Sequence, residues 1–349
     1  MHILGRETFY EHVHFNFDAN YRLARDWAEQ IERFLPEAVT RHSTGDWASQ
    51  EICERRLGLT DWNRGLVIQS VIQRLQQPPL STQFNNSQRI EALEEQLQQL
   101  RQQMGAASAE ATARGIYLDA LSHAPTDYLL RENFAEFLES TGDFKASAAE
   151  WQQACGLSPG NPFAFFQAGR LLARMGQAAP AQAALLMAVS LHPRYFEAWL
   201  ELGKLSFAEG EYEPALKNYG HARQLQPGDP RVYFEMGRAL SLLQRPSASI
   251  GSFRHAIQLK PEYWEAHYCL GGELALQGDI PEAGSEFETV IQLQPGYAPA
   301  HLNLGVALMK QNQLNDAYRQ FQVTLLLDPT NRLASDYLRQ VQYQKGHAP

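Results

Sequence analysis

Seven prolines recur along this chain of 349 residues at a constant interval of 34 residues. They are Pro125, Pro159, Pro193, Pro227, Pro261, Pro295 and Pro329. A fixed period of this length is typical of repeat proteins, in which one supersecondary unit buries its apolar face only against its neighbours. The period therefore predicts a solenoid of stacked units and disfavours a globular domain built around a single core.

Small and large side chains keep fixed places within the period. When each proline is counted as position 32, six full repeats begin at Tyr128, Pro162, Phe196, Pro230, Trp264 and Ala298. Positions 8 and 20 carry only Gly, Ala or Ser, whereas position 24 is large, as Trp151, Leu185, Tyr219, Phe253, Phe287 and Phe321. Small residues let two helix backbones approach, and the large neighbour fills the remaining volume. The pattern predicts an all-α chain with two antiparallel helices in each repeat.

Turn residues separate the two predicted helices of each repeat. They are Gly142, Gly176, Gly210, Gly278 and Asn312, residue types that tolerate the left-handed conformation at the end of a helix. Gln244 stands at this place in the fourth repeat, which predicts a strained or differently built turn there. The recurring proline ends the second helix, because proline has no N–H to donate and clashes with the preceding turn.

The repeats resemble the tetratricopeptide repeat (TPR) over residues 128–331. The resemblance rests on the positions above, on large residues at position 4 and on a Leu-Gly pair, as in Phe165, Trp199, Tyr233, Leu202-Gly203, Leu270-Gly271 and Leu304-Gly305. It implies a right-handed superhelical solenoid of about six full repeats that binds protein partners. Arg131, His267 and His301 depart from the large apolar type at position 4, which predicts altered local packing within the same fold.

The ends of the array predict capping elements. Residues 332–349 predict a polar capping helix and tail, and residues 87–127 an atypical capping repeat whose second helix covers Ala109–Ser122. Apolar residues spaced three and four apart run through the first helix of this repeat, at Ile90, Leu93, Leu97, Leu100 and Met104. They indicate either an over-long capping helix or a coiled-coil seam that joins two copies. Two heptads are short for a coiled coil, so we favour a monomer.

Residues 36–86 predict a helical connector between the N-terminus and the repeats. Helices are expected near Trp47–Leu57 and Asp61–Gln76, and Thr60 is a favourable N-cap for the second. A Pro-Pro step followed by small and amide residues predicts a linker over Gln77–Ser87.

Residues 1–35 contain Glu11 three residues before His14, followed by an amphipathic run over Asn20–Phe34. This segment resembles the last conserved block of the SGNH (GDSL-type) hydrolases. The resemblance implies that His14 is the remnant of a general base and that Glu11 orients it. Because no Gly-Asp-Ser nucleophile block occurs in the sequence, we expect no esterase activity from this chain. The alternative is that it forms the C-terminal, partner-recruiting half of a larger SGNH-type esterase or acyltransferase.

The TPR resemblance implies that positions 2, 5, 9, 12 and 13 of each first helix line a binding groove. Position 5 forms an apolar ladder, and position 9 is basic in three repeats, which together give Phe166, Leu200, Phe234, Tyr268, Leu302, Arg170, Lys204 and Arg238. These residues predict a peptide or protein partner with apolar anchors and an acidic segment. Alternatively, the ladder packs against the neighbouring helix, and the cations only pair along their own helices, as in Glu201–Lys204 and Glu235–Arg238.

The composition narrows the remaining function classes. With 30 basic and 39 acidic side chains the net charge is −9, which disfavours a nucleic-acid surface. No run approaches the roughly 18 apolar residues of a membrane-spanning helix. Three cysteines without Cys-x-x-Cys spacing disfavour a metal site or a disulfide framework, and no motif indicates a cofactor. The N-terminus lacks the apolar core of a signal peptide, so we expect a cytoplasmic protein unless an export signal lies upstream of Met1.

Overall fold

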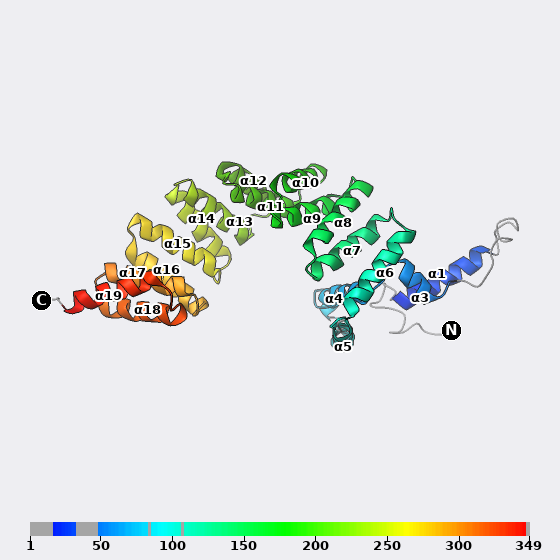
Figure 1. The fold of residues 1–349 in the computed structure, drawn as a ribbon, viewed down its shortest axis with the longest axis horizontal. Helices are drawn as coiled ribbons and strands as arrows, with labels where there is room; N and C mark the ends of the chain where they lie inside the picture. Colours follow the sequence, from blue (N-terminus) through cyan, green and yellow to red (C-terminus); the bar gives the residue numbers. More distant parts are fainter. Residues whose placement is uncertain (1–16, 33–47, 83–84, 106–107, 347–349) are drawn as a thin grey trace. The chain divides into compact units, whose positions relative to one another are not determined.

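The computed structural model describes residues 17–32, 48–82, 85–105 and 108–346, and all regular structure within these ranges is helical. The α-helices of these ranges are labelled in Figure 1, and they confirm the all-α prediction. The chain divides into two compact units, residues 1–171 and 172–349. None of the helices in these ranges combines the length and the apolarity that a membrane-spanning helix requires.

The helices of the N-terminal unit run up to the first part of α9. They are α1 (Phe17–Glu32), α3 (Gln50–Arg56), α4 (Asp61–Leu75), the short 3-10 helix η1 (Leu80–Thr82), α5 (Asn86–Met104), α6 (Ala109–His123), α7 (Tyr128–Ser140), α8 (Phe144–Leu157) and α9 (Pro162–Arg174). The first full repeat is the pair formed by α7 and α8. In this pair the Ser147 hydroxyl at position 20 donates to the Ala135 carbonyl at position 8 over 2.7 Å, which joins the two backbones where the sequence predicts their approach.

The segment before the first repeat packs differently from the prediction. Leu93, Leu97 and Leu100 of α5 are buried against α4, so the apolar seam is not free to join two copies of the chain. Helices α4 and α5 therefore form a packed pair, with η1 between them in the sequence. The reason is that the apolar face of α4, with Ile68 and Leu75 at 0% exposure, needs the α5 seam to cover it.

Helix α6 packs against α3, which precedes it in the sequence, and against α7, which follows it. Its Tyr117 side chain is fully buried, and the Tyr117 hydroxyl donates to Asn63 Oδ1 over 2.8 Å. Asn63 also completes a capping box with Thr60, which confirms the predicted N-cap of α4. Helix α4, which lies within the predicted connector, is thus part of the core of the N-terminal unit.

The C-terminal unit contains the end of α9 and all later helices. They are α10 (Ala178–Leu191), α11 (Phe196–Ala208), α12 (Tyr212–Leu225), α13 (Pro230–Leu242), α14 (Pro246–Leu259), α15 (Trp264–Gln277), α16 (Ile280–Leu293), α17 (Ala298–Lys310), α18 (Leu314–Leu327) and the capping helix α19 (Arg332–Gly346). From α10 to α19, each helix packs against the next one along the chain, with α11/α12, α13/α14, α15/α16 and α17/α18 as the helix pairs. This sequential packing is the solenoid that the period predicts.

The small and large positions of each repeat meet inside the helix pairs. A Cβ atom added to Gly203 would lie 2.3 Å from the ring of Tyr219, well inside van der Waals contact. The same close approach joins Gly237 to Phe253, Gly271 to Phe287, and Gly305 to Phe321. In these four pairs the ring at position 24 therefore occupies the space that a side chain at position 8 would need.

The turns within the repeats adopt the left-handed backbone conformation. Its φ angles are 87° at Gly142, 73° at Gly176, 79° at Gly210 and 88° at Gly278. Gln244 adopts the same conformation with φ 56°, which costs a non-glycine residue about 1 kcal/mol. The predicted strained turn in the fourth repeat is confirmed.

Position 4 carries a hydrogen-bond donor at the tip of a large side chain in five of the repeats. Each donor lies 2.8–3.1 Å from the carbonyl oxygen of the recurring proline, which stands six residues earlier. The donors belong to Arg131, Trp199, Tyr233, His267 and His301. These side chains keep the contact because the carbonyl needs a donor, which an imidazole or a guanidinium supplies as well as an indole. Local packing at Arg131, His267 and His301 does differ in the second partner. These three side chains reach position 23, whereas Trp199 and Tyr233 lie against a histidine ring at position 26.

The two buried histidines at position 4 have different second partners. Nδ1 of His267 lies 2.5 Å from a carboxylate oxygen of Glu286, whereas Nδ1 of His301 lies 2.8 Å from the side-chain amide of Gln320. Burial lowers the pKa of His267, but the hydrogen bonds to Glu286 and to the Pro261 carbonyl, together with the Glu286 charge, raise it above its ordinary value. Since the carboxylate and the carbonyl only accept, both ring nitrogens of His267 donate, as in an imidazolium.

Glu286→Gln is expected to lower the pKa of His267, because an amide removes the negative charge beside the imidazolium. In the wild type, the raised pKa stabilises the folded state fully below about pH 6.5, and this contribution is lost as the pH rises through the folded-state pKa. As the pH rises from about 6.5 through the folded-state pKa of His267, the unfolding free energy of the variant should therefore fall less than that of the wild type. An NMR titration of the imidazole protons measures the pKa directly.

The matched control is Glu288→Gln on the exposed face of the same helix, which removes an equal charge away from the imidazole. It should leave the His267 titration where it is in the wild type. An unchanged His267 pKa in Glu286→Gln would contradict the assigned cause.

Candidate ligand-binding pocket in the C-terminal unit

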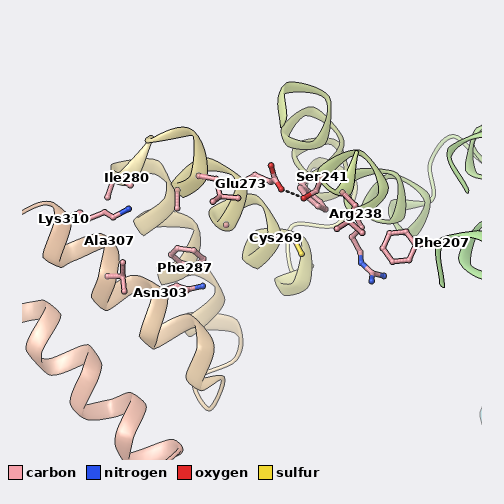
Figure 2. A pocket seen from close by; sticks show the side chains of 16 residues that line it. Phe207, Arg238, Ser241, Cys269, Glu273, Ile280, Phe287, Asn303, Ala307 and Lys310 are labelled. Atoms are coloured by element: carbon pink, nitrogen blue, oxygen red, sulfur yellow. Dashed lines mark hydrogen bonds between the residues drawn. The ribbon is translucent and has the colours of Figure 1, made fainter. Parts of the chain in front are cut away.

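A pocket of about 570 Å³ lies in the C-terminal unit, and most of its lining comes from first helices of successive repeats. Phe207 of α11, Arg238 of α13, Cys269 of α15 and Lys310 of α17 contribute to its lining (Figure 2). The buried rings of Phe253 and Phe287 reach it from the second helices α14 and α16. Its volume is in the range of small-molecule and side-chain binding pockets.

The pocket exists because small residues replace long ones in the fifth and sixth repeats. Position 9 is Gly272 in α15 and Val306 in α17, whereas the three preceding repeats carry Arg or Lys there. A Cβ added to Gly272 would meet no other atom within 4 Å, so the space above it is open. Ala275 and Ala307 leave further room beside it.

Apolar side chains form much of the pocket and part of its rim. Leu276 of α15 is 80% exposed and Leu242 of α13 is 49% exposed, although both line the pocket. Exposed leucines beside an apolar hollow are an unfavourable arrangement in water, and covering them with an apolar ligand is favourable.

Six polar side chains complete the lining, namely Arg238, Ser241, Cys269, Glu273, Asn303 and Lys310. The Arg238 guanidinium pairs with Glu235 over 2.9 Å and lies 4.4 Å from the ring centre of Phe207. The Ser241 hydroxyl donates to the carboxylate of Glu273, and this carboxylate residue is only 8% exposed. Burial raises the pKa of the Cys269 thiol to about 11, so the thiol is protonated at neutral pH and is a poor nucleophile.

Of the eight predicted groove residues, only Arg238 lines this pocket. Phe166 and Arg170 belong to the N-terminal unit, where the Arg170 guanidinium donates two hydrogen bonds to Glu139 over 2.7 and 2.8 Å. Lys204 pairs with Glu201 over 2.8 Å.

Position 5 contributes mainly to helix packing in the C-terminal unit. Leu200 is 2% exposed and lies in a core cluster with Tyr219, so it offers no surface to a ligand. Phe234, Tyr268 and Leu302 are half-buried and pack against a second core cluster. In this unit neighbouring helices thus cover Leu200 fully, whereas Phe234, Tyr268 and Leu302 keep part of their surface exposed.

Nine of the sixteen lining residues stand at positions 9, 12 and 13, which the resemblance places in a groove, although the sequence singled out only Arg238 among them. Sequence reasoning missed positions 6 and 10, which supply Cys269, Asn303, Glu273 and Ala307. The available signal was the change from basic to small or apolar residues at position 9, at Gly272 and Val306. That change marks the repeats where the first helices leave space.

Other predicted sites remain untested. Glu11 and His14 lie outside the residues that the structure describes, and α1 begins only at Phe17. Among the described residues, no three His, Cys, Asp or Glu side chains gather as metal ligands would.

Comparisons with known proteins identify the repeats. Two family models described as tetratricopeptide repeat match, one at residues 166–230 and 234–298 and the other at residues 274–340. No curated protein matches the sequence. None of the matched segments includes residues 1–35, so these comparisons do not support the resemblance to SGNH hydrolases.

Solved structures share the fold at low sequence identity. The C-terminal part of a TPR repeat-containing protein from Cytophaga hutchinsonii is 18% identical, with a TM-score of 0.56, and covers 66% of this chain and 94% of its own. The pilF protein of Pseudomonas aeruginosa is 13% identical, with a TM-score of 0.54 and coverage of 61% and 97%. A chain of the APC/C hetero-tetramer Cut9–Hcn1 is 14% identical, with a TM-score of 0.52 and coverage of 96% and 60%.

The sequence period, the helix pairs and the matched models agree with one another. At these identities the solved structures bear on the fold alone. Tetratricopeptide repeats are therefore present between residues 166 and 340, and the chain has the fold of a tetratricopeptide-repeat solenoid.

Proposed function

We propose that this chain is a non-catalytic interaction scaffold that binds a peptide or an extended protein segment at the pocket of the C-terminal unit. The observation that carries the proposal is the open, largely apolar hollow above Gly272, bordered by the exposed side chains of Leu242 and Leu276. An apolar side chain of the partner would fill this hollow and remove both leucines from water.

The three cations predicted to bind an acidic segment are already paired within the chain. Arg170 pairs with Glu139, Lys204 with Glu201, and Arg238 with Glu235. An acidic partner would have to compete with these carboxylates, so its gain at each cation would be small. The apolar hollow is therefore a better basis for recognition than the predicted acidic segment.

The chemistry of the pocket also favours binding over catalysis. Its thiol, Cys269, has a pKa raised by burial to about 11, and its hydroxyl, Ser241, donates to a carboxylate. The residues that line the pocket include no histidine that could act as a general base toward either group.

Filling the pocket tests the proposal. Gly272→Trp places an indole in the open space, and we expect it to weaken binding by about ten-fold or more, because the apolar anchor loses its site. The probe is a bead-displayed library of short random peptides, incubated with the fluorescently labelled full chain. Selected peptides are then titrated against the wild type and the variant.

Gly251→Trp is the matched control. Gly251 also has open space around a Cβ, but it lies on the exposed face of α14 and does not line the pocket. This variant should bind as the wild type does, and circular dichroism verifies that both variants fold. Unchanged binding by Gly272→Trp, or no peptide enrichment by the wild type, would overturn the proposed function.

A further inference from the structure

The carboxylate of Glu273 is a charged feature of the pocket that an apolar ligand leaves unexplained. Glu273 stands on α15, lines the pocket and is 8% exposed. The Ser241 hydroxyl from α13 donates a hydrogen bond to it, as Figure 2 shows. Within the part of the chain that the structure describes, no Lys, Arg or His forms an ion pair with Glu273.

Other carboxylates of the same unit are paired when they lie close to the core. Glu201 pairs with Lys204, Glu235 with Arg238, and Glu286 with His267. An ionised carboxylate can accept about four hydrogen bonds, and removing it from water without a cation is costly. Glu273 lines the pocket and accepts one hydrogen bond there, from Ser241, so it retains acceptor capacity for a ligand.

The cations nearest along the lining do not neutralise this group. Arg238 on α13 is held by Glu235 and by the ring of Phe207. Lys310 comes from α17, on the other side of α15, and it forms no ion pair with Glu273 (Figure 2). The Ser241 oxygen has lone pairs left after donating its proton, so Ser241 and Glu273 together can accept from a single donor group.

We propose that Glu273 is a specificity-determining residue that binds the cationic head of a lysine or arginine side chain of the bound segment. This inference rests on the proposed function and adds the chemistry of the partner. The aliphatic stem of such a side chain fits the apolar wall formed by Leu276 and Val306, while its head reaches the carboxylate. The part of the partner that enters the pocket is then basic. Its charge is opposite to that of the acidic segment predicted from the cations at position 9.

Charge removal at constant shape tests the inference. Peptides selected by the wild-type chain should carry lysine or arginine beside an aliphatic residue. For such a peptide, Glu273→Gln is expected to weaken binding by about ten-fold, because a hydrogen bond to a charged group is lost from a buried site. Replacing the lysine of the peptide by norleucine, which keeps the stem and removes the charge, should make wild type and variant bind alike.

Two controls separate a local effect from a general one. Glu288→Gln removes the same charge from an exposed position on α16, and it should leave the affinity for the basic peptide unchanged. The basic peptide should also slow alkylation of Cys269 by a neutral thiol reagent, because Cys269 lines the same pocket. Mass spectrometry of the digested protein assigns the label to Cys269 and not to Cys53 or Cys155.

The outcomes distinguish this inference from the proposed function. Suppose that Gly272→Trp abolishes binding but Glu273→Gln leaves the preference for lysine intact. The pocket then binds a partner, and the proposed role of Glu273 is wrong. Enrichment of acidic or purely apolar peptides by the wild type would also overturn that role. If Gly272→Trp has no effect and Cys269 is not protected, both the pocket and the role of Glu273 are wrong.

Discussion

Phe321→Ala is expected to lower the unfolding free energy of the C-terminal unit by about 3–5 kcal/mol. Phe321 is 0% exposed and packs over Gly305, and its ring stacks on Tyr337 of the capping helix with 5.4 Å between ring centres. The substitution leaves a cavity between α17, α18 and α19, because a helix pair with a glycine at position 8 has no side chain there to fill it. Urea unfolding followed by circular dichroism measures the change.

Leu326→Ala on the same helix provides the control. Leu326 is 80% exposed, so its substitution should change the unfolding free energy by only about 0.5 kcal/mol. In repeat proteins each unit is stabilised by its immediate neighbours, so the loss at Phe321 should first appear as unfolding of the C-terminal end. Equal effects of the two substitutions would contradict the assigned role of position 24.

Gly203→Ala is expected to destabilise the α11/α12 pair by about 1–3 kcal/mol through overpacking. The added methyl group would lie 2.3 Å from the Tyr219 ring, and that ring is 0% exposed, so it has no free space into which to move. Helix propensity by itself predicts the opposite sign, since alanine is favoured over glycine in a helix by about 1 kcal/mol. Thermal and urea unfolding decide between packing and propensity.

Gly220→Ala makes the same chemical change in the partner helix α12. A Cβ at Gly220 would meet no other atom within 4 Å, so only the propensity term applies and the variant should gain about 0.5–1 kcal/mol. The two alanine substitutions are thus expected to have opposite signs in one helix pair. A gain in stability of the Gly203→Ala variant would show that the backbones of α11 and α12 can move apart without a free-energy cost.

Several parts of the fold follow from contacts that the period itself encodes. The glycine at position 8 and the ring at position 24 are always 16 residues apart, as in Gly305 and Phe321, because one tight turn joins the two helices. The left-handed turns follow in the same way, and even Gln244 could be identified as strained from its place in the period. The role of position 4 was not predictable, since it needs the direction of a donor relative to the Pro carbonyl.

The candidate site could be predicted only in part. The resemblance indicated which faces of the first helices line a groove, but it did not show that Leu200 at position 5 is covered by its neighbours. The sequence contains the change to Gly272 and Val306, yet it does not show that this change leaves an open hollow. The contact between Ser241 and Glu273 spans 32 residues and two helices, so its existence depends on how those helices are rotated against each other.

The sequence by itself determined the repeat length, the all-α class, the helix pairs and the place of each tight turn. These features depend on contacts between residues that lie a fixed, short distance apart in the sequence. A periodic sequence repeats these contacts in every repeat. Only the tertiary structure decided that the α5 seam covers α4, which apolar residues are core, and where Glu273 is buried. The physical reason is that burial and pairing depend on the rotation and spacing of helices that are distant in sequence, and a small change in either moves a side chain from the core to a pocket.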